Sequence, residues 1–72
     1  MIRVLHVEHI DKTVLVTLEH PFAARHADVK SAAINAALDA GLEFELGTER
    51  ISGRGNVSTF SWEALTQARA VR

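Results

Sequence analysis

Apolar and polar residues alternate through the first twenty positions in a pattern that predicts a β-hairpin. Residues 2–9 and 13–20 are rich in Val, Ile, Thr and Leu, which suit a pleated, half-buried surface, and a short turn separates them. If residues whose numbers sum to 22 lie opposite each other, Arg3 meets Glu19 and the main apolar positions share one face. We expect that face to be the core side of the sheet; it comprises Ile2, Val4, Val14, Val16 and Leu18.

The opposite face of this hairpin carries apolar residues as well. In the same register Leu5, Val7 and Leu15 form a small apolar patch. The solvent-exposed face of a sheet normally carries polar residues instead. The last helix or the same face of a second subunit would cover this patch; alternatively, the three side chains are simply exposed aliphatics. Leu5, Val7 and Leu15 are therefore the candidate protein interface.

In residues 28–46 the spacing of apolar residues changes at a glycine, from the 3.6-residue repeat of a helix to the two-residue alternation of a strand. The apolar positions of the first part recur at helical spacing, and the helix begins at the N-cap candidate Asp28 or earlier, near Phe22. Gly41 suits the left-handed position that ends a helix. The alternating residues that follow predict a third, half-buried strand, with Leu42, Phe44 and Leu46 on one face and Glu43 and Glu45 on the other.

The last third of the chain predicts a loop, a short strand and a second helix. The loop is residues 47–56, with three glycines, and the strand is residues 57–60. Ser61 is the expected cap of a helix over residues 62–71, where Phe60 and Leu65 match a hydrophobic staple. Trp62 is either a core residue under that helix or an interface anchor.

Together these elements predict one α+β domain over residues 1–72 with the order β-β-α-β-β-α. We expect a small, mostly antiparallel sheet of three or four strands, with the central helix packed on one face.

Composition narrows the class of protein. A chain of 72 residues has a thin core, and alanine supplies much of its apolar content, so a partner subunit would help to stabilise it. The absence of cysteine excludes disulfides and thiolate zinc sites. A net charge of −1 argues against a dedicated nucleic-acid binder. No apolar run is long enough for a signal peptide or a membrane span, so we expect a soluble, cytoplasmic protein without membrane contact.

The polar residues predict no catalytic, metal or cofactor site. His6, His9, His20 and His26 lack the spacing of metal ligands. Glu43 and Glu45 share one face of the predicted third strand, where carboxylates usually form the solvated side. We therefore expect a protein that is not an enzyme.

The 47–56 loop is the second candidate site. Arg50, Arg54 and Asn56 stand among its glycines, and guanidinium groups beside exposed backbone amides suit an anion or a phosphate backbone. The alternative is an ordinary soluble connection.

Two functional hypotheses follow. The first is a small non-enzymatic protein-interaction module that acts as a homodimer or binds another protein. A compact single domain of this kind would suit a phage or mobile-element accessory protein. The second is a nucleic-acid-binding accessory protein that uses Arg50, Arg54, Arg69 and Arg72.

Overall fold

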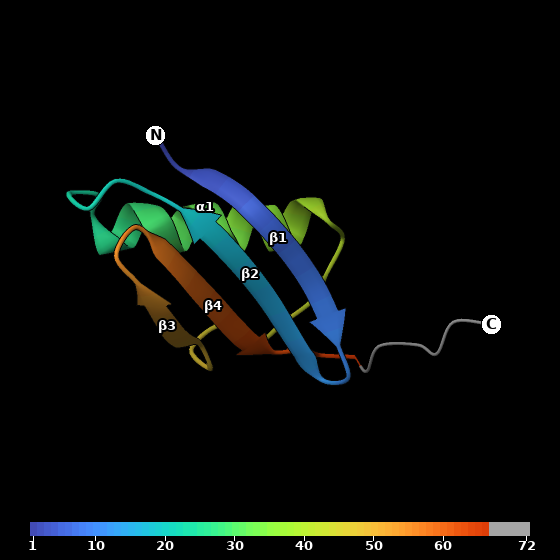
Figure 1. Ribbon diagram of the computed structural model, residues 1–72. Helices are drawn as coiled ribbons and strands as arrows, with labels where there is room; N and C mark the ends of the chain where they lie inside the picture. Colours follow the sequence, from blue (N-terminus) through green and yellow to red (C-terminus); the bar gives the residue numbers. More distant parts are fainter. Residues whose placement is uncertain (67–72) are drawn as a thin grey trace.

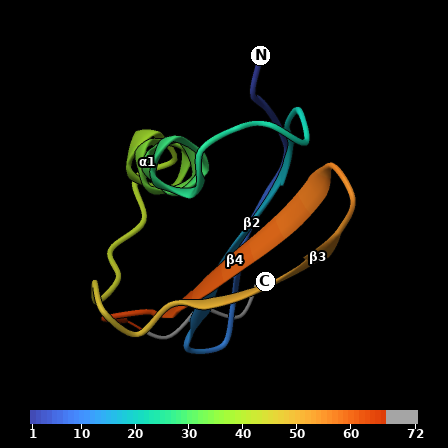
Figure 2. The same ribbon diagram turned by 90° about the vertical axis from the view of Figure 1, so that its left-hand side faces the viewer.

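The computed structural model describes residues 1–66 as a four-stranded antiparallel sheet with one helix on one face (Figures 1 and 2). The elements follow in the order β1 (Arg3–Ile10), β2 (Thr13–Glu19), α1 (His26–Asp39), β3 (Arg50–Arg54) and β4 (Val57–Glu63). In the sheet the strands lie in the order β1-β2-β4-β3, so β1 and β3 are the two edges. The predicted α+β class and the β-β-α-β-β order are confirmed.

The first hairpin follows the predicted register for only two pairs. Arg3 lies opposite Glu19 and Val4 opposite Leu18, as predicted. A register shift between Val4 and His6 then leaves Leu5 unpaired, so that Val7 lies opposite Val16. An extra residue of this kind is a β-bulge, and it moves every following side chain of β1 to the other face. The predicted register is therefore wrong from Leu5 onward.

Helix α1 starts at His26, between the two predicted starts. Its N-cap is Arg25, which makes no side-chain cap hydrogen bond, so the predicted N-cap at Asp28 is wrong. Asp28 lies in the first turn, where a carboxylate suits the helix dipole. At the other end Gly41 has φ of 78°, its N–H donates to Leu38, and the Leu42 N–H donates to Ala37. These bonds form a Schellman motif, so the predicted glycine stop is confirmed.

The core lies between α1 and the sheet. Small helix residues allow α1 to lie close to β2, while β4 contributes the two largest buried side chains, Phe60 and Trp62. The rings of Phe60 and Trp62 stack at 5.8 Å between centroids. The buried residues are Val14, Val16, Leu18, Val29, Ala33, Ala37, Phe60, Trp62 and Ala64.

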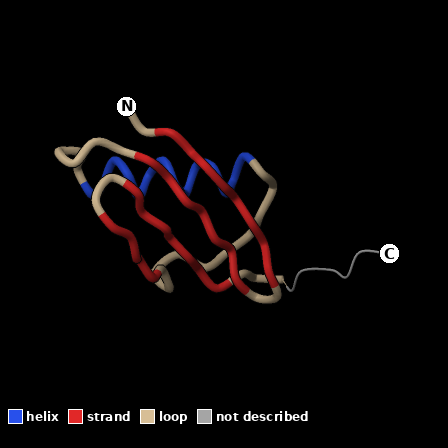
Figure 3. Tube along the Cα trace, in the orientation of Figure 1, coloured by secondary structure: helices blue, strands red, loops and turns tan. Residues whose placement is uncertain are grey.

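The predicted third strand over residues 42–46 is wrong. Phe44 makes only an isolated bridge with Ala64, and the segment belongs to an irregular connection from α1 to β3 (Figure 3). Strand β3 occupies this edge of β4 as far as Ser61, so the segment reaches only the end of β4. There the Glu45 N–H donates to the Glu63 carbonyl, and the Leu65 N–H donates to the Glu43 carbonyl. Phe44 instead packs on Trp62, with 4.9 Å between ring centroids, while Leu46 is largely exposed.

The predicted 47–56 loop contains strand β3. Residues 50–54 pair with β4 from Arg50 opposite Ser61 to Arg54 opposite Val57. The amino-acid composition of this segment does not predict a strand, because glycine is depleted in strands. Gly53 is needed here, because a Cβ at this position would overlap the Val57 carbonyl oxygen.

The second helix predicted over residues 62–71 is not seen. Trp62 and Glu63 continue β4, Ser61 pairs with Leu15 instead of capping a helix, and Leu65 is exposed instead of forming a staple. Residues two apart point to the same face of a strand but not of a helix. Because Phe60 and Trp62 are both buried on the same face, this segment is a strand. The rest of the predicted helix, residues 67–71, lies outside the described residues.

No helix within residues 1–66 has the length and apolar character that crossing a bilayer requires.

The core assignment predicts different costs for two leucines of the hairpin. Leu18→Ala should lower the free energy of unfolding by about 2–5 kcal/mol, because it leaves a cavity beneath α1. Leu5→Ala, at a position that is 46% exposed, should cost about 1 kcal/mol or less. Urea unfolding followed by Trp62 fluorescence measures both, and equal losses would contradict this assignment of the core.

Candidate interaction edges of the sheet

The face of the sheet opposite α1 carries mostly hydroxyl and charged side chains. Directly paired residues of antiparallel strands share a face, so this open face can be read from the register. Thr17 and Thr59 lie at its centre, with 3.3 Å between their hydroxyl oxygens. Phe60 and Trp62 point to the other face, toward α1. The described part of the open face therefore offers no Phe, Tyr or Trp ring for stacking on a base.

The structure does not bring the three predicted interface residues together. Leu15 is half-buried on the open face, between Glu8 and Ser61. Leu5 lies in the bulge of β1 and is exposed, whereas Val7 packs against the core on the helix side. The bulge separates the patch because it reverses the side on which Val7 lies.

The outer edge of β1 combines apolar and charged residues. Val4, Leu5 and Ile10 are each between 42% and 48% exposed, which is high for large aliphatic side chains. On the open face the His6 ring lies 3.0 Å from the Glu8 carboxylate. The strand is eight residues long, and no other strand of the described chain pairs with its outer side.

Arg50 and Arg54 lie on the open side of β3, and all five residues of this strand are exposed. Four residues of strand separate the two arginines by about 13 Å, so they do not converge on one small anion. Neither arginine forms an ion pair within residues 1–66. Asn56 lies in the turn after β3, where its carbonyl accepts a hydrogen bond from the His20 N–H. Arg50 and Arg54 thus form a basic strand edge, and Asn56 lies beyond it in the turn.

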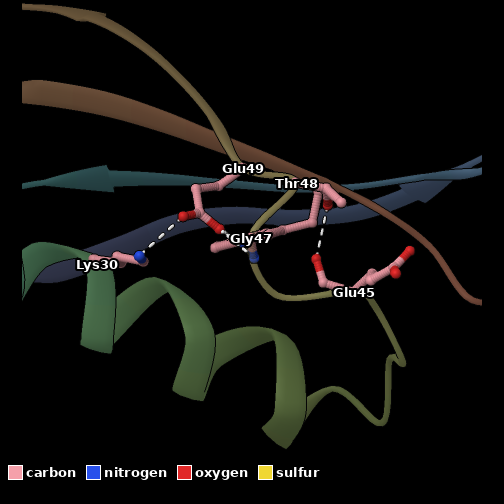
Figure 4. A network of polar contacts seen from close by, with 6 residues as sticks. Lys30, Glu45, Gly47, Thr48 and Glu49 are labelled. Atoms are coloured by element: carbon pink, nitrogen blue, oxygen red, sulfur yellow. Dashed lines mark hydrogen bonds and ion pairs between the residues drawn. The ribbon is translucent and has the colours of Figure 1, made fainter.

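Glu49, which sequence reasoning missed, fixes the start of β3 (Figure 4). Its carboxylate accepts hydrogen bonds from Lys30 of α1 at 2.9 Å, from the Gly47 N–H at 2.9 Å and from the Trp62 indole at 3.1 Å. The hydrogen bond from Lys30, followed by that from Gly47, lowers the pKa of Glu49 from 4.5 to about 2. Lys30 was the one available sequence signal, because a lysine on the apolar side of a helix must extend its ammonium group to water or to an acidic partner.

Thr48 adds a second set of bonds beside Glu49. Its hydroxyl donates to the Glu45 carbonyl at 2.7 Å and accepts from the Glu63 N–H at 2.9 Å. These bonds join the α1–β3 connection to the end of β4, so the start of β3 is held from both the helix and the sheet.

A histidine and a serine are in contact where β2 ends. His20 donates through Nδ1 to the Pro21 carbonyl at 2.9 Å and accepts through Nε2 from the Ser58 hydroxyl at 2.8 Å. Activation of a serine nucleophile needs such a contact together with room for a substrate. The surface hollow next to Arg50, of ≈ 500 Å³, lies at the other end of the sheet, around Thr13 and Glu63. The His20–Ser58 bond instead ties the end of β2 to β4.

Within residues 1–66 no three His, Asp or Glu side chains lie close enough together to hold a metal ion.

The Glu49 contacts predict a specific dependence of stability on pH. Because the folded state lowers the pKa of this carboxylate, its stabilising effect is complete above about pH 4.5 and is lost as the pH falls toward about 2. Glu49→Gln should therefore destabilise the protein most near pH 7, and the difference from wild type should shrink between pH 4.5 and 2. Urea unfolding across this range measures the difference, with the exposed Glu43→Gln as control. A difference that does not change with pH would contradict the role of Glu49.

No protein-family model matches this chain, and no curated protein or solved structure matches it either. The function proposed next accordingly depends on the geometry of the two sheet edges.

Proposed function

We propose that this protein is a small non-enzymatic interaction module that forms a homodimer through the outer edge of β1. The observation that carries the proposal is this eight-residue edge strand, whose outer backbone groups have no partner strand within residues 1–66. A free row of N–H and C=O groups is a template for another strand, and pairing two copies would extend the sheet across a two-fold axis.

The side chains of β1 favour one self-pairing register. On the regular part of β1 beyond the bulge at Leu5, a two-fold axis that passes through a residue keeps helix-side residues opposite helix-side residues and open-face residues opposite open-face residues. With the axis at Val7, His6 of each copy faces Glu8 of the other copy, which pairs complementary groups on the open face. With the axis at Glu8, two carboxylates face each other, which is unfavourable. We therefore place the axis at Val7.

The apolar character of this edge supports the same surface. Val4, Leu5 and Ile10 are partly exposed along β1, and a second copy of the strand would remove part of their surface from water. The core of the single chain is small, so burial of further apolar surface on association would add usefully to its stability.

The nucleic-acid hypothesis has less support from the geometry. Arg50 and Arg54 lie on the open face, but Glu8 and Glu63 share that face, and a third arginine there, Arg3, is already paired with Glu19 at 2.8 Å. Phe60 and Trp62, which could stack on bases, point into the core. Arg69 and Arg72, the other arginines of that hypothesis, lie outside the described residues.

A charge-swap series tests the dimer. The wild-type protein should be a dimer by size-exclusion chromatography with light scattering, whereas His6→Glu should be a monomer, because it places two carboxylates opposite each other at both ends of the pairing. Adding Glu8→Lys to His6→Glu should restore the dimer, since Glu then faces Lys across the axis.

The matched control is Ser52→Glu, which adds one carboxylate to the opposite edge of the sheet and should leave the dimer intact. Circular dichroism of each variant confirms that the fold is kept. A wild-type monomer at ~0.5 mM would end the proposal. Dimers that persist in His6→Glu would exclude the β1 register.

A further inference from the structure

We infer that the outer edge of β3 binds an extended acidic segment of a partner protein by strand addition. This inference rests on the proposed interaction function, and it names the partner chemistry, but it does not require the homodimer. The edge lies on the far side of the sheet from β1, so both surfaces can be occupied at once.

The backbone of β3 is available and already in strand form. Strand β4 is its only partner in the described sheet, and the other side of β3 is open. Its start is held by Glu49, which bonds to Lys30 and Trp62, and its end is held by the short turn into β4. A strand that is ordered before binding has less conformational entropy to lose when a peptide pairs with it.

The charges of β3 select an acidic strand. Arg50 and Arg54 lie on the open face with Ser52 between them, and neither arginine has an ion-pair partner within residues 1–66. Glu or Asp opposite each arginine would form cross-strand ion pairs, which stabilise a sheet. A second copy of β3 fits poorly, because an axis at Ser52 would place Arg50 opposite Arg54. The same two arginines therefore disfavour self-pairing and favour an acidic partner.

The helix-side positions of β3 select an aliphatic residue between the acidic ones. Ile51 points to the side of α1 but is 48% exposed, since α1 packs over β2 and β1 and leaves β3 uncovered. Gly53, the next residue on that side, has no side chain, and the backbone of Val57 and Ser58 fills the place where its Cβ would lie. Ile51 is therefore the one apolar side chain that β3 presents on the helix side. An alternating segment with acidic residues on one face and aliphatic residues on the other matches both sides of the edge.

A polyanion such as single-stranded nucleic acid is the competing ligand for two arginines. It would use the guanidinium groups but neither the free backbone of β3 nor Ile51. The open face also presents Glu63 near Arg50, and this carboxylate would repel a phosphate chain, whereas Glu19 is paired with Arg3 at 2.8 Å. The combination of free backbone, alternating side chains and charge favours the peptide.

The probe is an acetylated and amidated peptide with the core Glu-Val-Thr-Val-Glu, which reads identically in both directions and so fits parallel and antiparallel pairing. Titration into ¹⁵N-labelled protein should shift the amide signals of residues 50–54 and slow their hydrogen exchange. Replacing the central Thr of the peptide by Pro should abolish the slowed exchange, because proline has no N–H for the ladder.

Protein variants test the charges. Arg50→Glu with Arg54→Glu should weaken binding by ~10-fold or more and should make the protein bind the Lys-Val-Thr-Val-Lys peptide instead. Arg25→Glu, a matched change at an exposed arginine outside the sheet, should leave binding unchanged. Both arginines of β3 are exposed, and neither has an ion-pair partner among residues 1–66, so the folded spectrum should be retained in each variant.

The titration is repeated on the His6→Glu variant, where binding should persist even if the protein is a monomer. The absence of shifts in β3 at ~1 mM peptide would overturn the inference and leave the β1 dimer untouched. Equal binding of the acidic and basic peptides would also overturn it. A twelve-nucleotide single strand that shifts the same amides more strongly than the peptide would replace it with a nucleic-acid site.

Discussion

The burial of Phe60 and Trp62 beneath α1 is the constraint on which the rest of the structure depends. Both side chains come from β4, the strand that pairs on each side, with β2 and with β3. Trp62 also contacts Phe44 with its ring and donates its indole N–H to Glu49. One strand thus fixes the sheet, closes the core and holds the connection that leads into β3.

Glu49 illustrates how a strongly perturbed carboxylate can be structural. Active sites often depress or raise a pKa, but so do ion-pair networks that hold a fold together. Here one oxygen accepts from Lys30, and the other accepts from the Gly47 amide and the Trp62 indole. A carboxylate engaged in this way is a poor general base, because a proton must compete with three hydrogen bonds. Its contribution is to place the start of β3 against both the helix and β4.

The position of α1 makes the two sheet edges chemically different. The helix packs over β2 and β1, so β1 has a core on one side and partly exposed aliphatic residues along its edge. Strand β3 lies beyond the helix, is exposed throughout and carries two arginines on one face. An apolar edge with complementary charges is suited to pairing with its own copy, whereas a basic edge repels its copy and suits an acidic strand.

Local patterns determined much of the fold by themselves. The alternation of residues 2–20 gave the first hairpin, and the helical period up to the left-handed Gly41 gave α1, because these signals come from neighbours in the chain. The tertiary structure decided the rest. The bulge at Leu5 separated Leu5, Val7 and Leu15. Trp62 became part of strand β4 instead of a helix. The glycine-containing segment with Arg50 and Arg54 became strand β3. In each case the deciding partner lay on another strand or under the helix, and long-range pairing of this kind leaves little trace in local periodicity.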